Sequence, residues 1–485
     1  MITEQPYKKR RLIISCIIFF VSVMLFVLNN SLLLLTVPFI FLLLPFFFNY
    51  TVTATENIFW LMIFFLPLST ELNVTETLGL DFPDEPLLIL LTGFFFAKWL
   101  HQPGVIPGSL LKNKLFILIV LQLFWILITC VFSVNPLLSF KFFLAKIWYV
   151  VPFVILVQII ISSKTDLLKL ALLLLLPMLF VVIQTIIRHS FYSFSFEGIK
   201  QTLYPFFRNH VNYSAMLVCL LAVIWCIKKL TAASNPFYKW INAGLMAGVV
   251  AVLLSFSRGA WLALLMGIFA AYLIKRKWIV HFWITIICVL IGFFSWLMYH
   301  NHYLQFAPDH DRTIFHTAFS EHLKATVALK DVSNAERFYR WVAGINMIAA
   351  KPITGFGPNN FYDNYKNYSQ SIFKTWVSNN PDHSTVHNYF LFVALEQGIP
   401  GLIIFVAILL YAFIALQQLY FTIQSKFYRQ VCLSIVSILM MITTVIFLSD
   451  LIETDKIGSL FWLCLGLTIW LQSKAEEEKT AIAVI

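Results

Sequence analysis

The sequence predicts an all-α fold, a polytopic transmembrane helix bundle with one large loop domain outside the membrane, and three observations carry this prediction. First, 60% of the 485 residues are hydrophobic and only 12% are charged, whereas a soluble domain has about 25% charged residues. Second, apolar runs of about 17–22 residues, long enough to cross a bilayer as helices, recur from end to end. Third, no polar linkers divide the chain, although a soluble chain of this length would split into domains. These observations exclude a soluble enzyme, a disordered protein and a disulfide-stapled scaffold.

The formal net charge of +11 has the sign of a nucleic-acid-binding protein, but its distribution argues against that function. Lys and Arg gather in short stretches between apolar runs, where they set membrane topology and form no basic patch. The seven cysteines lie almost entirely within apolar runs and form no C-x-x-C pair, so the sequence predicts neither a metal site nor disulfides. No nucleic-acid partner is expected.

The chain starts with four basic residues at 8–11, followed by an apolar run. A signal peptide begins in the same way, but no small-residue cleavage site follows and a second apolar run starts at Ser31, which favours an uncleaved first span. With the N-terminus inside, the Lys- and Arg-rich loops fall on the cytoplasmic side and the acidic stretch 71–85 falls outside. The third and fourth spans are short and fit a tilted or partly re-entrant course, so we expect roughly 12 to 14 spans. They lie near 12–28, 31–48, 57–70, 87–100, 115–133, 144–162, 167–187, 210–227, 240–256, 260–274, 278–298, 401–423, 430–449 and 457–472.

One long segment, 299–386, has a water-soluble composition and is far longer than an ordinary connection. Ser333 and Glu336 have the spacing of a capping box, which predicts a helix to about Ala350. One face of that helix is apolar and suited to lie on the membrane surface or on the helix bundle. We therefore divide the chain into a transmembrane bundle of about 11 spans at 1–298, a large outer loop domain at 299–386, a segment with the His387 helix and the C-terminal spans at 387–472, and a cytoplasmic tail at 473–485.

Arg258 stands between two apolar spans, in the sequence Ser-Phe-Ser-Arg-Gly-Ala-Trp at 255–261. An arginine at a membrane boundary is costly and usually faces a cavity, a partner or a substrate. Its planar guanidinium with five donors suits a phosphate group. The alternative is an interfacial anchor that snorkels beside Trp261.

Arg337 and Arg340 lie three residues apart on the predicted loop helix and so on neighbouring parts of its surface. Two cations beside the apolar Phe338 and Trp341 suit anionic lipid headgroups or a pyrophosphate. The alternative is a solvated basic face on an amphipathic helix.

His387 lies just before the chain re-enters the membrane. Histidine takes up a proton near neutral pH, and at a lipid–water boundary it can meet both a lipid-linked and a soluble substrate. The alternative is a hydrogen-bonded interfacial histidine. The neighbouring Asp382 and His383 have no role that the sequence defines.

Two weaker signals lie in the same outer segment. His310, His316 and His322 recur at a spacing of six residues, which is not the spacing of a helical metal pair. Aromatic residues downstream suit a stacking surface for sugar rings, although aromatic belts at the membrane boundary have the same composition. The candidate stacking residues are Tyr362, Tyr365 and Trp376.

These residues carry a resemblance to a known family. His387-Asn388 is followed by nine residues and then by Gly398 and Gly401, a pattern that resembles the H-N-x9-G-x-x-G signature of bacterial O-antigen ligases. The segment 255–261 looks like the other hallmark of the O-antigen ligase and polymerase superfamily. The stretch from Glu336-Arg337 through Trp341 to Lys351-Pro352 and Gly355-x-Gly357 is similar to the start of its large periplasmic loop.

The resemblance implies a GT-C-like glycosyltransferase of the bacterial inner membrane, with its active site on the periplasmic face and a glycan linked to undecaprenyl pyrophosphate as donor. It implies that Arg258 and Arg337 hold the pyrophosphate and that His387 is catalytic. Arg340 has no clear counterpart and is a weaker third candidate for the pyrophosphate. The residues implied to form the structural motif are Asn388, Gly398, Gly401 and Gly259.

We therefore expect an O-antigen ligase that transfers the glycan, with inversion, to a sugar hydroxyl of lipid A–core. We expect no metal and no other cofactor, because no convincing Asp/Glu cluster accompanies the outer site. A repeat-unit polymerase and a protein O-oligosaccharyltransferase remain alternatives that differ in the acceptor. A lipid or glycan transporter is a fourth, but it would need ionisable residues at mid-span and an inverted repeat.

Overall fold

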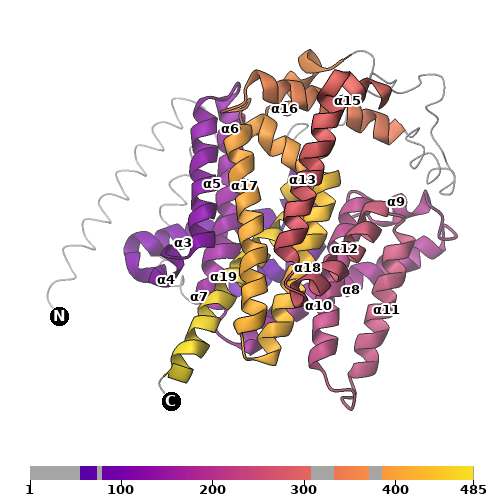
Figure 1. Ribbon diagram of the computed structural model, residues 1–485. Coiled ribbons are helices and arrows are strands. Elements are labelled where there is room, and N and C mark those ends of the chain that lie inside the picture. Colours follow the sequence, from indigo (N-terminus) through magenta and orange to yellow (C-terminus); the bar gives the residue numbers. More distant parts are fainter. Residues whose placement is uncertain (1–54, 74–78, 307–331, 371–384, 484–485) are drawn as a thin grey trace, which may run out of the picture.

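The computed structural model describes residues 55–73, 79–306, 332–370 and 385–483. Within these ranges the chain is a bundle of helices (Figure 1), which confirms the predicted all-α class. The strands of the described part are β1 (Thr70–Asn73) and β2 (Gly79–Phe82), which form a small antiparallel hairpin. The first two predicted spans lie outside the described residues.

Eight helices of the described part are long and apolar enough to span a membrane. Two shorter apolar helices, Thr55–Leu68 and α11 (Tyr238–Leu254), accompany them. The further helices are α3 (Asp84–His101), α4 (Gly108–Leu111), α9 (Gly198–Thr202), α15 (Val332–Ala350), α16 (Phe361–Asn364) and α19 (Asp455–Ala483). The eight candidate spans are α5 (Lys114–Val131), α6 with α7 (Pro136–Ile160, joined by a π-helical turn at Val151–Leu156), α8 (Lys164–Ser190), α10 (His210–Leu230), α12 (Arg258–Lys275), α13 (Ile279–Met298), α17 (Tyr389–Thr422) and α18 (Lys426–Leu448).

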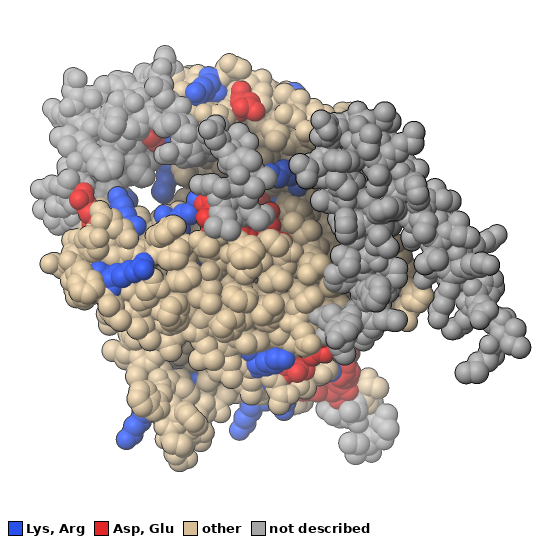
Figure 2. Space-filling view, turned by 180° about the vertical axis from the view of Figure 1, so that it is seen from behind, with Lys and Arg blue, Asp and Glu red and all other residues tan. Residues whose placement is uncertain are grey.

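The charged residues lie mainly at the two ends of the bundle, as in a membrane protein (Figure 2). Figure 2 shows a broad band of uncharged surface, with Lys, Arg, Asp and Glu gathered above and below it. Apolar side chains that face outward are stable only against lipid, and many residues of α5, α8 and α13 expose them. The chain is therefore a multi-pass membrane protein.

Helix α18 forms the centre of the bundle and packs against α10, α12, α17 and α19. Its apolar window is the most buried of the eight candidate spans, at 72%. Gly267 of α12 lets the two helices approach closely, since a Cβ there would meet the Met441 side chain. The Ser437 hydroxyl donates to the Gly267 carbonyl at 2.9 Å, which fixes the register of α12 on α18.

Several chain connections meet at one end of the bundle. The Asn388 side chain, just before α17, donates to the Phe447 carbonyl at the end of α18 (3.0 Å). The backbone N–H of Val134, between α5 and α6, donates to the Phe356 carbonyl (3.0 Å). Thr454, before α19, contacts Asn212 of α10 (3.5 Å). The predicted outer segments therefore share one face of the molecule.

Helix α15 confirms the helix predicted to begin near 333 and to end at Ala350. It lies on the bundle (Figure 1) and packs against α17. The Trp341 indole donates to the Val386 carbonyl at 3.0 Å, and Gly344 faces Leu395 and Val386. The face of α15 that is buried in the bundle consists of Tyr339, Val342, Ala343 and Met347, while Phe338 and Trp341 of the predicted apolar face are only partly buried.

Helix α19 extends past the predicted boundary at 472. Helix α19 runs without interruption from the last predicted span to Ala483. Lys474 and Glu477 form an ion pair at 2.8 Å on this extension.

Candidate functional site

His387 is held at the start of α17 by the residue that follows it. The Asn388 carboxamide oxygen accepts from the Leu391 N–H at 3.0 Å and caps the helix, while its amide group donates to the Phe447 carbonyl at 3.0 Å. His387 itself has a φ of 53°, in the left-handed region. Its Nδ1 lies 3.9 Å from Oδ1 of Asp450. The His-Asn pair therefore joins α17 to the turn after α18 and faces the imidazole toward a carboxyl group.

Two arginines of α15 act on this imidazole. Burial, the positive charge of Arg340 and the positive charge of Arg337 together lower the pKa of His387 from 6.5 to about 3. A buried imidazole next to cations loses its own positive charge, because protonation costs both desolvation and repulsion. His387 is thus neutral at physiological pH and has a lone pair available.

Arg340 differs from Arg337 in its contacts. Its guanidinium is 7% exposed, pairs with Glu336 at 3.4 Å and donates to the Thr385 carbonyl at 3.2 Å. These bonds fix the residues that lead into His387. Arg340 therefore fits a positioning role better than the pyrophosphate contact that the sequence predicts for it, whereas Arg337 is only half-buried.

Arg258 is the first residue of α12 and is half-buried. The next residue, Gly259, lies against the end of α18: a Cβ there would be 3.6 Å from the Leu448 side chain. Asn388 binds the neighbouring Phe447. Arg258 and His387 thus flank the same short stretch at the end of α18, although they are 129 positions apart in the sequence.

Gly398 serves the docking of a loop onto α17. Its φ of 72° and ψ of 177° interrupt the helix, and a Cβ would lie 1.9 Å from the Ile353 carbonyl oxygen. This opening lets the Ile399 N–H donate to the Pro352 carbonyl at 2.8 Å. Gly401 comes close to the Trp125 ring in the same way.

Glu396 holds the other end of this loop. Its side chain is fully buried. Its carboxyl oxygens accept from three consecutive backbone N–H groups, those of Asn359 (2.7 Å), Asn360 (2.9 Å) and Phe361 (3.1 Å). Because the loop continues from α15, this clamp fixes α15, and with it Arg337, against α17.

Sequence reasoning missed three polar residues of the site. Asp450 faces His387, and burial raises the pKa of its carboxyl group, with Thr385 and Arg340 acting in the opposite direction. Lys146, 3% exposed on α6, pairs with Glu453 at 2.6 Å. The signal that the sequence offers is the acidic group of Asp450, Glu453 and Asp455, which follows the predicted span at 430–449.

The predicted stacking surface is partly wrong. Tyr365 is fully buried and stacks on Phe361 with ring centroids 4.8 Å apart, so it cannot contact a glycan. Tyr362 is half-buried. Among the described residues, no group of three His, Cys, Asp or Glu is arranged to hold a metal ion. Trp376, Asp382, His383, His310, His316 and His322 lie outside the described residues.

The family comparison bears on the same region. The family model for O-antigen ligase matches residues 243–406. This part of the chain is similar to the O-antigen ligase family. It contains Arg258, Arg337 and His387, whereas Asp450 follows it. A comparison with curated proteins gave no significant match.

The O-antigen ligase match sets the broad class of the protein. The match indicates a glycosyltransferase-type enzyme that is embedded in the membrane and acts on lipid-linked glycans. The matched range ends within α17, just beyond the Gly398 interruption that docks the loop. The matched part thus carries His387, Arg258, Arg337 and the Glu396 clamp.

Proposed function

We propose that this protein is an O-antigen ligase that transfers a glycan from undecaprenyl pyrophosphate to a sugar hydroxyl of lipid A–core. The proposal places it in the bacterial inner membrane with its site facing the periplasm. One observation carries the mechanism: a neutral imidazole lies beside a carboxyl group, with Arg337 on one side and Arg258 at the same helix end. The family match supports the reaction class.

His387 acts as the general base in this proposal. With the Nδ1 proton directed at Asp450, the Nε2 lone pair is free to accept the proton of the attacking hydroxyl. Asp450 orients the ring and stabilises the imidazolium as it forms. The hydroxyl oxygen attacks the anomeric carbon from the face opposite the pyrophosphate, so the configuration at that carbon inverts.

Arg258 and Arg337 bind the leaving group. The bond between the anomeric carbon and the pyrophosphate oxygen breaks, and negative charge grows on the pyrophosphate in the transition state. Cations that are already in place lower that barrier most. Guanidinium groups also bind phosphate oxygens in a bidentate manner, which gives orientation as well as charge.

A His387→Ala variant tests the mechanism. In proteoliposomes with a lipid-linked glycan and lipid A–core, we expect transfer to fall by at least about 100-fold while membrane insertion is unchanged. His281→Ala, at an exposed position on α13, is the matched control and should keep full activity. Near-normal transfer by His387→Ala would remove this residue from the mechanism.

The glycan profile of a deletion strain tests the acceptor. A ligase leaves lipid-linked polymer that fails to reach lipid A. Single repeats attached to lipid A would instead identify a repeat-unit polymerase, and loss of glycan from a protein alone would identify an O-oligosaccharyltransferase.

A further inference from the structure

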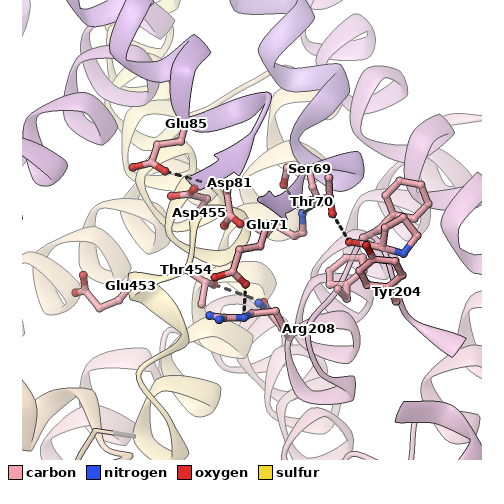
Figure 3. A pocket seen from close by; sticks show the side chains of 15 residues that line it. Ser69, Thr70, Glu71, Asp81, Glu85, Tyr204, Arg208, Glu453, Thr454 and Asp455 are labelled. Carbon is pink, nitrogen blue, oxygen red and sulfur yellow. Dashed lines mark hydrogen bonds and ion pairs between the residues drawn. The ribbon is translucent and has the colours of Figure 1, made fainter. Parts of the chain in front are cut away.

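A polar cavity of about 440 Å³ opens beside the candidate site (Figure 3). Its size lies within the usual range for pockets that bind small molecules. Three parts of the chain that are distant in sequence build it: the β1–β2 hairpin with the start of α3, the segment 204–212 that leads into α10, and the turn that leads into α19 with the first residues of that helix. It includes Glu453, three residues after the Asp450 that faces His387. Asp450 and the cavity residue Glu453 therefore lie on the same short turn.

The charged residues of the lining are mainly acidic. Five carboxyl groups line the cavity, against two cations. Both cations are already bound by protein oxygens: Arg208 pairs with Glu71, and Lys456 Nζ donates to the Ser69 carbonyl at 2.8 Å. The five carboxyl groups are those of Glu71, Asp81, Glu85, Glu453 and Asp455.

These carboxyl groups keep capacity for a ligand. A carboxylate offers about four acceptor positions, of which the protein uses only some, although burial raises the pKa of Asp455 and of Glu85 and favours their protonated forms. Glu453 accepts from Lys146 at 2.6 Å, and Glu85 accepts from the Asp81 N–H at 3.3 Å. Such a lining matches a ligand that is rich in O–H or N–H donors.

One wall of the cavity is aromatic. Tyr204 is 73% exposed and lies at the edge of the cavity away from Glu453, as Figure 3 shows. Phe206 and Phe207 continue this wall. The Thr70 hydroxyl donates to the Pro205 carbonyl at 2.7 Å and fixes the segment that carries these rings to the hairpin. A polar floor with an exposed ring at its edge suits a ligand with one polar edge and one C–H face.

We propose that this cavity binds a neutral or amino sugar ring of a glycan substrate and excludes sugars that carry carboxylate or phosphate groups. The inference deepens the proposed function and rests on it, because only that function makes the bound sugar part of a substrate. Sugar hydroxyls donate to the carboxyl groups, and the C–H face of the ring packs against Tyr204. An anionic sugar would place acceptor against acceptor and like charge against like charge.

The cavity and the arginine side of the site differ in charge, so they bind different parts of the substrates. Arg258 and Arg337 suit the pyrophosphate, whereas the acidic cavity repels it. Glu453, which lines the cavity, pairs with Lys146 at 2.6 Å. A sugar in the cavity is thus held close to Asp450 and His387 without competing for the arginines.

Binding of simple sugar probes to the full chain in nanodiscs tests the proposal. The probes are the methyl glycosides of glucose, galactose and mannose, together with methyl glucuronide and methyl glucosaminide. Their binding is measured by ligand-observed NMR. We expect at least one neutral glycoside and the amino sugar to bind, and the glucuronide to bind about tenfold more weakly than the glucoside. Asp81→Asn with Glu85→Gln should remove that difference, and Tyr204→Ala should weaken all sugars. Glu476→Gln, an exposed change of the same kind on α19, should have no effect.

Three results would overturn the proposal. They are the absence of binding by any neutral glycoside, equal binding of the glucoside and the glucuronide, and sugar binding that the cavity variants leave unchanged. Tight Mn²⁺ binding that Asp81→Asn abolishes, without sugar binding, would instead identify a cation site.

The source of the sugar is decided by competition in the transfer assay. Inhibition by the bound glycoside that is competitive with the acceptor assigns the cavity to the acceptor sugar, and inhibition competitive with the donor assigns it to the donor glycan. Failure of the proposed function can be distinguished from failure of the cavity proposal, because His387→Ala should lose transfer and keep sugar binding. If His387→Ala keeps transfer, the mechanism fails while the binding result stands.

Discussion

Replacing Glu396 by Gln tests the clamp that fixes the loop to α17. The change keeps the size of the side chain but turns one carboxyl oxygen into an NH₂ group. Three backbone N–H groups point at the carboxyl group, and the Gln side chain has one acceptor oxygen with two lone pairs. At least one N–H, that of Asn359 or the pair from Asn360 and Phe361, then faces another donor.

The structure sets the size of the effect. A buried N–H that loses its acceptor costs about 1–3 kcal/mol. The best orientation keeps the bonds to Asn360 and Phe361 and loses only the shortest one, to Asn359 at 2.7 Å. We therefore expect a loss of about 1–3 kcal/mol in the stability of the docked loop. Because α15 continues into this loop, Arg337 should be held less firmly relative to His387.

Thermal unfolding and transfer, measured on the same preparation, check this expectation. Glu396→Gln should lower the unfolding midpoint and reduce kcat, while Glu476→Gln at an exposed position of α19 should change neither. A Glu396→Gln protein with wild-type stability and wild-type transfer would refute the idea that the clamp positions α15.

Four further predictions follow from the same contacts. Asp450→Asn should lower kcat roughly tenfold or more with little change in KM, because it removes the group that orients His387; a wild-type kcat would contradict this. Folding keeps His387 neutral, with a pKa of about 3 against 6.5, so the unfolded chain binds more protons between these values. Wild-type stability should therefore fall more than that of His387→Gln as the pH drops from 7.5 to 5, which thermal unfolding at both values measures. Gly398→Ala should destabilise the protein by at least about 3 kcal/mol, since its Cβ would lie 1.9 Å from a carbonyl oxygen, whereas Gly244→Ala meets open space and should not. Transfer should continue in the presence of EDTA, and loss of activity that added Mg²⁺ restores would show a metal requirement.

The sequence was sufficient for the parts of the fold that local patterns determine. Hydropathy depends on neighbouring residues alone, so the class and the approximate positions of most described spans could be predicted. The helix at 332–350 followed from a capping box and an apolar stripe. The family pattern identified His387, Arg258 and Arg337 as candidate site residues, and the hydropathy pattern predicted that all three lie on the same side of the membrane.

The contacts that hold the site together could not be predicted, because they join residues far apart in the chain. Glu396 binds N–H groups more than thirty positions away, and Lys146 pairs with Glu453 across 307 positions. No spacing rule connects such residues without the fold. Tyr365 shows the opposite error: an aromatic residue suits a glycan surface, but its ring is fully buried and contacts Tyr339 of α15.

The two arginines that depress the basicity of His387 are also the reason why donor binding matters under the proposed function. Burial lowers the pKa of His387 most, and the charges of Arg340 and Arg337 lower it further, so the imidazole is neutral and a weak base. A pyrophosphate bound at Arg337 brings negative charge that offsets this repulsion, and an added anion raises the pKa of a neighbouring imidazole. His387 then becomes a stronger base only when the leaving group is in place. An acceptor hydroxyl, or water, that reaches the site without a donor meets a histidine with little tendency to take its proton, so the same charges that hold the donor also limit wasteful proton transfer in its absence.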